Sequence, residues 1–214
     1  PPGPEDTVLD PACGSGGFLI MAIRALRESL KTAFPNLGET QLQDKIGYFA
    51  ANNLFGADIN DRMARVAKMN MIMHGDGHAG IANVNGLSLI ASLPTNWEYN
   101  LDEGKFDIVY SNPPFAGREK DPTVLERYEL GKNKDGKVRS VSKEVLFIEM
   151  ILRRLKPGGR AGLVLPAGIF NNPSMKHVRD YIKSHSKIIG LVGIPHLAFQ
   201  ISGANNEGHL LLLE

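Results

Sequence analysis

The chemical pattern that points most directly to a function is the run Asn112-Pro113-Pro114-Phe115, which follows the apolar segment 105–111. Proline has no N–H group and its ring fixes φ at about −65°, so two adjacent prolines form a stiff turn without competing donors. The side-chain oxygen of Asn112 and the carbonyl of Pro113 can together accept both hydrogens of one amino group. That localises the amine lone pair, while Phe115 offers a face on which a planar base can stack. The run therefore predicts an amino-binding site; the alternative is that the prolines only end a strand.

A glycine-rich loop, Asp-Pro-Ala-Cys-Gly-Ser-Gly-Gly at residues 10–17, follows the first short apolar segment and precedes a helical pattern. Glycines permit a tight turn and the close approach of a ligand to backbone N–H groups. The loop lacks the Lys-Ser/Thr pair of a phosphate-binding P-loop and the full Gly spacing of a dinucleotide fingerprint. An NAD site is therefore weakly supported. The alternative is a turn that only packs a helix on a strand.

Asp58 stands where an acidic residue commonly binds ribose hydroxyls, at the end of the second expected strand. It lies further from Asp10 than the roughly 20 residues of a minimal unit, and we interpret segment 35–53 as an insertion that explains the excess. Two carboxylates and a glycine loop without phosphate-binding residues suit a ligand with an amine, a carboxylate and a ribose. S-adenosylmethionine is such a molecule.

Apolar runs alternate with segments of helical period along the chain. The expected strands are 7–12, 54–59, 83–89, 105–111, 160–166, 187–195 and 209–214, and the expected helices are 17–34, 61–75, 142–159 and 174–185. Strands that alternate with helices indicate a mainly parallel sheet. The last two strands are joined by a short Gly/Asn-rich segment, which favours an antiparallel hairpin. We therefore predict one α/β domain over residues 1–214, with helices on both faces of a seven-stranded sheet.

Composition sets limits on function. The 214 residues suffice for a sizeable core, and the net charge of +1 gives no global signal for nucleic acid or membrane. No apolar run approaches the roughly 20 residues of a membrane span. The only cysteine, Cys13, excludes an internal disulfide and fits a reducing compartment. The two chain ends suggest a fragment of a longer protein.

The amino-acid sequences of these motifs resemble those of a known family. The segments DPACGSGGFLI, FGADIN, MNMIMHG and SNPPF are similar to those of amino-group DNA methyltransferases. Together with LKPGGRAGLVLPAGIF, they resemble the modification subunit of type I restriction–modification systems, from about Val8 to the final strand. The resemblance implies a Rossmann-like methyltransferase fold and S-adenosylmethionine-dependent N6 methylation of adenine flipped out of double-stranded DNA. It also implies separate specificity and restriction subunits as partners, no membrane, and a bacterial or archaeal cytoplasm.

The resemblance further implies roles for individual residues. The cofactor site would be formed by Asp10, Pro11, Ala12, Gly14, Gly16, Asp58 and Ile59. Asp10, Ala12 and Gly14 would line the methionine end of the cofactor, Asp58 would bind the ribose, and Ile59 would pack on the adenine ring. Asn112, Pro113, Pro114 and Phe115 would hold the flipped target adenine. Cys13 belongs to the cofactor loop and is not interpreted as a nucleophile.

Two features depart from the family pattern. An acidic residue often follows the third strand in related enzymes, whereas this chain has Asn85-Gly86-Leu87-Ser88. The family also has a cofactor-binding element before the first strand, which usually contains a Thr-Pro pair. We expect this element to lie upstream of residue 1.

Several alternatives stay open. The acceptor of the methyl group could be cytosine N4, RNA or a protein glutamine, and the chain could be a silent scaffold subunit. The long segment 116–143 carries many charges of both signs and either closes over DNA phosphates or is an ordinary solvated loop. His74 and His78 have the spacing of a helical metal pair, but the glycines between them break the helix, so no metal site is expected.

Overall fold

The computed structural model describes residues 1–74, 80–88, 104–195 and 207–214. Packing divides the chain into two compact units, Pro1–Ser111 and Asn112–Glu214. The boundary therefore falls directly before the Asn-Pro-Pro-Phe run. Each unit is described by itself.

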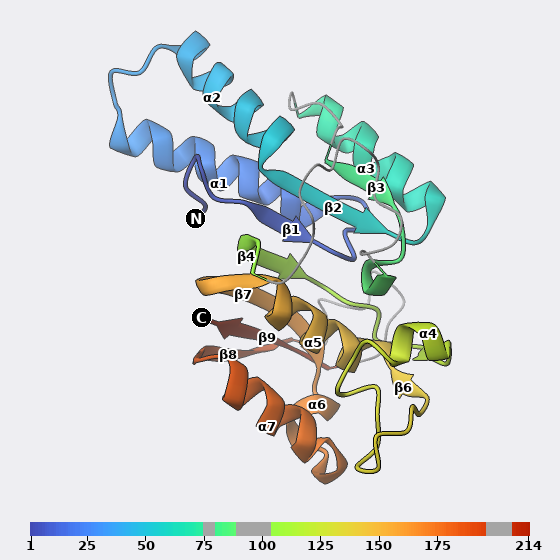
Figure 1. The fold of residues 1–214 in the computed structure, drawn as a ribbon. Helices are drawn as coiled ribbons and strands as arrows, with labels where there is room; N and C mark the ends of the chain where they lie inside the picture. The colour runs from blue at the N-terminus through green and yellow to red at the C-terminus, as the bar shows by residue number, and fades with distance from the viewer. Residues whose placement is uncertain (75–79, 89–103, 196–206) are drawn as a thin grey trace. The chain divides into compact units, whose positions relative to one another are not determined.

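The first unit contains four parallel strands in the order β3-β2-β1-β4 (Figure 1). They are β1 (Val8–Asp10), β2 (Leu54–Asp58), β3 (Ile81–Asn83) and β4 (Phe106–Ser111). Val8 lies opposite Leu54 on one side and opposite Ile108 on the other. Because all four strands point the same way, their last residues share one edge of the sheet. All four of these residues are polar, namely Asp10, Asp58, Asn83 and Ser111, and we call this edge of the sheet the polar edge.

Three helices pack on this sheet: α1 (Gly17–Ala33), α2 (Glu39–Asn52) and α3 (Asp61–Met73). One face of α1 is buried, and Leu19, Ile23, Leu26 and Leu30 on this face lie in the core. Asn60 caps α3, because its side-chain oxygen accepts the N–H groups of residues 62 and 63 at 3.0 and 3.3 Å. Helices α1 and α3 begin just after the ends of β1 and β2, and α2 leads into β2.

Segment 35–53, which we interpreted as an insertion, contains helix α2. Leu42, Ile46, Phe49 and Ala50 are buried on one side of α2, and this side packs in the same core as α1. Their spacing of four, seven and eight residues is that of a helix face. The segment is therefore part of the core that supports the site.

The third strand was predicted at 83–89, which is wrong. β3 ends at Asn83, and a 3₁₀ turn (η1, Gly86–Ser88) follows. The strand begins earlier because Gly80 lets the backbone approach β2 closely: the Gly56 N–H donates to the Gly80 carbonyl at 2.7 Å. A Cβ atom at Gly80 would collide with the carbonyl oxygen of Leu54.

The second unit contains three antiparallel strands in the order β7-β9-β8. They are β7 (Leu155–Pro166), β8 (Ile188–Ile194) and β9 (Gly208–Leu213), and Leu211 lies between Leu163 and Leu191. The terminal antiparallel hairpin is thereby confirmed. With the four parallel strands of the first unit, the seven strands make the fold a mixed, mostly parallel α/β type.

Helix α5 (Lys143–Arg154) lies against β7 and α7 (Lys176–His185), and two short helical pieces, α6 (Gly168–Asn171) and η2 (Pro173–Met175), precede α7. The predicted helix 142–159 was too long at its end. The backbone becomes extended at Leu155, and Pro157 disfavours a helical conformation at the residue before it. Most of α5 is buried all round, including the charged Glu149.

Segment 116–143 has a structure of its own. β5 (Arg118–Glu119) pairs antiparallel with β6 (Val141–Ser142), and the short helix α4 (Pro122–Leu125) lies between them in the chain. Val124, Leu125, Tyr128 and Leu130 are buried. The charged residues of this segment therefore belong to a segment with defined secondary structure and buried apolar residues.

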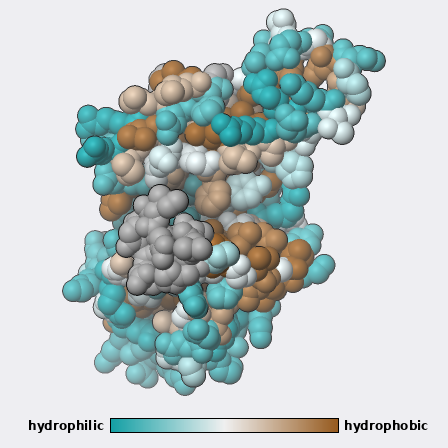
Figure 2. All heavy atoms as spheres, turned by 180° about the vertical axis from the view of Figure 1, so that it is seen from behind, coloured by the Kyte–Doolittle hydropathy of each residue, from teal (hydrophilic) through white to brown (hydrophobic). Residues whose placement is uncertain are grey.

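Strand β8 exposes apolar residues along its length, namely Ile188, Ile189, Leu191 and Val192. Figure 2 shows hydrophobic surface on the side of the molecule where Figure 1 draws this strand. Within the ranges that the structure describes, no helix is both long and apolar enough to cross a membrane.

Candidate active site

The Asp10 side chain lies at the end of β1 and is 1% exposed. Burial raises its pKa from 3.8 to about 7, although the Ala12 N–H, which donates to Oδ1 at 3.1 Å, opposes the shift. Ser111 also favours the ionised form, but its buried hydroxyl makes no hydrogen bond of normal geometry with any described residue. A buried acid beside an unsatisfied hydroxyl is a polar site that suits a polar or cationic ligand.

The glycine loop is shaped by two left-handed residues. Gly14 has φ 54° and Gly16 has φ 85°, a region that residues with a Cβ atom rarely adopt. A Cβ at Gly14 or Gly17 would meet no atom of a described residue within 4 Å, whereas one at Gly16 would contact Ala67 at 3.5 Å. Open space therefore borders the loop on the side of Gly14.

Asp58 ties this loop to the next turn of the chain. Its Oδ2 accepts the N–H of Gly14 at 3.0 Å, and its Oδ1 accepts the N–H of Asn60 at 2.7 Å. The backbone adds a further link, since the Cys13 N–H donates to the Ala57 carbonyl at 2.9 Å. Each carboxylate oxygen can accept another hydrogen bond, so Asp58 can still bind hydroxyl groups.

Two asparagines that we did not predict also position the site. The Asn83 amide donates to the carbonyls of Asp58 and Ile59 at 2.9 and 3.1 Å, and the Asn70 amide donates to the carbonyl of Ser15 at 2.9 Å. Asn83 ends a strand at the polar edge, which was a usable signal. It was missed because the third strand was placed too late in the chain.

The surroundings of the loop fit S-adenosylmethionine. Helix α1 begins at Gly17 with no side-chain cap and no acidic residue in its first turn, so its N–H groups favour a carboxylate. Ile59, next to Asp58, is 65% exposed, which leaves an apolar surface for a planar ring. The polar edge supplies carboxylates for an amine and for hydroxyl groups.

Cys13 is buried within the loop. Burial, together with the charges of Asp10 and Asp58, raises the pKa of its thiol well above the usual range. The thiolate is the reactive form of cysteine. This agrees with our interpretation that Cys13 is not a nucleophile.

The Asn-Pro-Pro-Phe turn opens the second unit. Asn112 and Pro114 are exposed, Pro113 is buried, and Phe115 is half-buried. Residues 112–115 are neither helical nor part of a strand, so β4 ends at the turn, as the simpler interpretation also requires. The Asn112 side chain forms no hydrogen bond with another described residue, which leaves its oxygen available as an acceptor.

The other predictions about this edge have separate outcomes. The predicted cofactor residues Asp10, Pro11, Ala12, Gly14, Gly16, Asp58 and Ile59 all lie in the first unit. Asn85 forms a local turn, accepting the Leu87 N–H at 3.0 Å, and no acidic residue stands between 84 and 88. His78 lies outside the described residues, so the pairing with His74 is not tested.

The fold is that of the S-adenosylmethionine-dependent methyltransferase class. A modification subunit of a putative type I restriction enzyme from Vibrio vulnificus superposes with a TM-score of 0.73 at 24% identity, over 99% of this chain and 40% of that one. The EcoKI M protein superposes with a TM-score of 0.69 at 25% identity, over 99% of this chain and 40% of that one.

The sequence places the chain more narrowly. The family model for N-6 DNA methylases matches residues 2–213, so the chain belongs to this family. It is 30% identical to the EcoKI methylase subunit of Escherichia coli over 78% of this chain and 28% of that protein. It is 25% identical to the type II enzyme and methyltransferase RM.BcgI of Heyndrickxia coagulans over 85% of this chain and 24% of that protein. The chain thus spans about a quarter to a third of the curated relatives it matches.

Proposed function

We propose that this chain is the catalytic domain of a type I modification subunit, which transfers a methyl group from S-adenosylmethionine to N6 of adenine in DNA. The observation that carries the proposal is the polar edge formed by Asp10, Asp58, Asn83 and Ser111. Asn112 continues the chain directly after that edge. Family membership and the resemblance to methylase subunits support the same function.

In this proposal the cofactor supplies a methyl group that is activated by its sulfonium. The first turn of α1 binds the cofactor carboxylate, Asp10 and the glycine loop line its methionine end, and Asp58 accepts hydrogen bonds from the ribose. Ile59 packs on the cofactor adenine. The Asn70 amide donates to the Ser15 carbonyl of the glycine loop and the Asn83 amide to the Asp58 carbonyl, so both position these groups without touching the ligand.

The Asn-Pro-Pro-Phe turn would bind the target adenine after it leaves the duplex. The Asn112 oxygen and the Pro113 carbonyl accept hydrogen bonds from the two N6 hydrogens, which raises the electron density on N6. As the bond between N6 and the methyl carbon forms, the bond from that carbon to the cofactor sulfur would break, S-adenosylhomocysteine would leave, and one N6 proton would pass to water. Phe115 stacks on the ring. The transfer needs no covalent enzyme intermediate, in keeping with a buried Cys13. The sequence of the DNA would be read by a specificity subunit, and cleavage would belong to a restriction subunit.

The central test is Asn112→Ala, assayed with radiolabelled cofactor and a specificity partner. We expect methyl transfer to fall by at least about 100-fold, as is typical for loss of a group that acts in the transition state, while cofactor affinity stays unchanged. Asn171→Ala is the matched control, because Asn171 is also exposed. Normal methylation by Asn112→Ala would contradict the role of this residue.

The same assay separates the alternative acceptors. DNA, RNA and protein are offered in parallel, and labelled DNA is digested so that the modified base can be identified. N6-methyladenine supports the proposal, whereas N4-methylcytosine or label in RNA or protein would replace it. No label in any acceptor, together with no cofactor binding, would favour a silent scaffold.

A further inference from the structure

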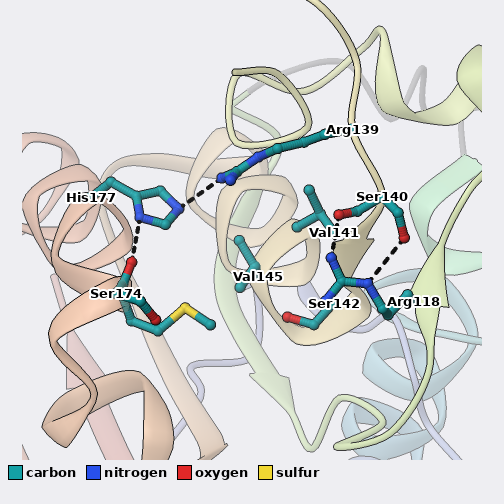
Figure 3. Close-up of a pocket in the computed structure, with 9 residues that line it drawn as sticks. Arg118, Arg139, Ser140, Val141, Ser142, Val145, Ser174 and His177 are labelled. Atoms are coloured by element: carbon teal, nitrogen blue, oxygen red, sulfur yellow. Dashed lines mark hydrogen bonds between the residues drawn. The ribbon is translucent and has the colours of Figure 1, made fainter. Parts of the chain in front are cut away.

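A polar cavity is lined entirely by residues of the second unit, none of which is assigned to the cofactor site. Its volume is about 200 Å³, and it is lined by Arg118, Arg139, Ser140, Val141, Ser142, Val145, Ser174, Met175 and His177. Figure 3 shows the guanidinium group of Arg139 next to His177 and that of Arg118 next to Ser140, with Val145 nearby. Among the described residues, the lining contains cations, hydroxyls and one imidazole, but no carboxylate.

Both guanidinium groups are held in place by uncharged partners (Figure 3). Arg118 donates from Nε to the Ser140 hydroxyl at 3.0 Å and from Nη2 to the Ser140 carbonyl. Arg139 donates to Nε2 of His177 at 3.2 Å. Neither arginine forms an ion pair with a carboxylate in the described part of the chain. Arginine carries five N–H donors, so most of them stay available to an acceptor in the cavity.

The tautomer of His177 follows from its contacts. Nδ1 lies 3.0 Å from the carbonyl oxygen of Ser174, which can only accept, so Nδ1 carries the hydrogen. Nε2 is then the acceptor for Arg139. A neutral His177 therefore fixes the orientation of Arg139 without reducing the positive charge of the cavity.

The backbone adds to this positive potential. The cavity borders the first turns of two helices, α5 and α7. The Lys143 N–H of α5 donates to the Gly117 carbonyl and the Lys176 N–H of α7 donates to the Pro173 carbonyl, so these helices contribute through their dipoles, which place partial positive charge at their N-termini. The carboxyl in the first turn of α5 belongs to Glu144, which is buried; burial raises its pKa, and the positive charge of Arg118 opposes that shift.

We infer that this cavity binds a phosphate oxyanion of the DNA backbone close to the flipped adenine. The inference rests on the proposed function and assigns it a further substrate contact. Planar guanidinium groups bind phosphate with two hydrogen bonds at once. Only three peptide steps of about 3.8 Å separate Phe115 from Arg118, so their Cα atoms lie within about 11 Å. A DNA strand rises about 3.4 Å per nucleotide, so we expect the bound phosphate to lie within a few nucleotides of the base.

The test uses the 214-residue chain and a fluorescein-labelled thymidine strand with one central adenine, with binding followed by anisotropy at low salt. The variants are Arg139→Gln and Arg118→Gln. Arg24→Gln, an exposed arginine of α1, removes the same charge outside the cavity. We expect each cavity variant to bind about tenfold more weakly and to lower the salt dependence by about one unit, and Arg24→Gln to do neither. Circular dichroism checks that each variant is folded.

A second arm locates the phosphate. Uncharged methylphosphonate replaces one phosphate at a time, either within three nucleotides of the adenine or further away. In the wild type, one of the near replacements weakens binding; in Arg139→Gln the same replacement has no further effect. Equal losses in the two proteins at every position would overturn the inference.

Three outcomes distinguish a DNA phosphate from free phosphate, and a failure of this inference from a failure of the proposed function. If inorganic phosphate raises the Tm of the wild type but not of Arg139→Gln, while both bind DNA equally, the cavity takes free phosphate and the inference is wrong. If the wild type binds a strand without adenine as tightly, the role of residues 112–115 fails, while the effect of the arginines is still measured. If the wild type binds no DNA, both fail.

Discussion

The Gly14 N–H donates to the Asp58 carboxylate at 3.0 Å, which joins the turn after the first strand to the end of the second. Asp58 accepts the Asn60 N–H as well, at 2.7 Å. One carboxylate thus holds two turns of the polar edge and still has lone pairs for a ligand. The residue assigned to the ribose is also the residue that fixes the loop beside it.

Asp58→Asn removes the negative charge of this side chain and one of its two acceptor oxygens. An amide has one acceptor oxygen, so its NH2 group must face one of the two N–H donors that Asp58 now satisfies. We expect the free energy of unfolding to fall by about 1–3 kcal/mol. S-adenosylmethionine affinity should fall as well, measured by calorimetry. Asp44→Asn, on the exposed side of α2, should change neither quantity. Full cofactor affinity in Asp58→Asn would be incompatible with the assigned role.

Gly14→Ala tests the open space beside the loop. The φ of 54° at Gly14 costs a residue with a Cβ about 1–2 kcal/mol, and the added methyl enters the space assigned to the cofactor. Gly136 is a matched control, since it has φ 75°, equal room for a Cβ, and lies in a turn of the second unit. Chemical denaturation should give similar losses of stability for both variants. Only Gly14→Ala should bind the cofactor more weakly; equal affinities would argue against a cofactor at this loop.

The pH dependence of Asp10 gives a third prediction. Its pKa is raised to about 7 in the folded chain, so the folded state binds a proton more strongly than the unfolded state between about pH 4 and 7. Stability therefore falls as pH rises through this window and levels off above it. Asp10→Asn removes the titrating group, so its Tm should fall less over the same range.

The affinity for the cofactor should also depend on the protonation state of Asp10. An amine next to Asp10 favours the carboxylate, so binding should tighten from pH 6 to 8 and release about one proton at pH 6. Calorimetry in two buffers of different ionisation enthalpy measures that proton. An equal release by Asp10→Asn would assign it to another group.

Glu149 anchors the segment that carries the charged residues of the second unit. Its carboxylate is fully buried and accepts the N–H groups of Glu129 and Leu130, each at 2.8 Å. Glu149→Gln leaves one of these donors facing an NH2 group. We expect a loss of about 1–3 kcal/mol in the free energy of unfolding, and faster amide hydrogen exchange at residues 129 and 130.

The matched control for Glu149 is Glu126→Gln, which alters an exposed side chain of the same segment. It should leave both measurements unchanged. Unaltered exchange in Glu149→Gln would mean that other contacts hold the segment.

Much of the fold could be predicted from the sequence, because local rules decide it. The apolar period of α1, the cap at Asn60 and the alternation of strands with helices follow from residue types a few positions apart. The glycine loop, Asp58 and the Asn-Pro-Pro-Phe turn were found in the same way. The missed helix α2 also had a local signal, in the spacing of Leu42, Ile46 and Phe49.

Only the tertiary structure decided which distant groups meet. The start of β3 depends on the approach of Gly80 to Leu54, and the loop is held by Asn83, Asn70 and Asp58 through contacts between separate elements. The meeting of Arg139 with His177 has the same origin. Such contacts form because the buried core fixes the elements that carry them, and no local pattern encodes a hydrogen bond across that distance. The sequence by itself thus determined the chemistry of the polar edge, and the packing decided how that edge is held.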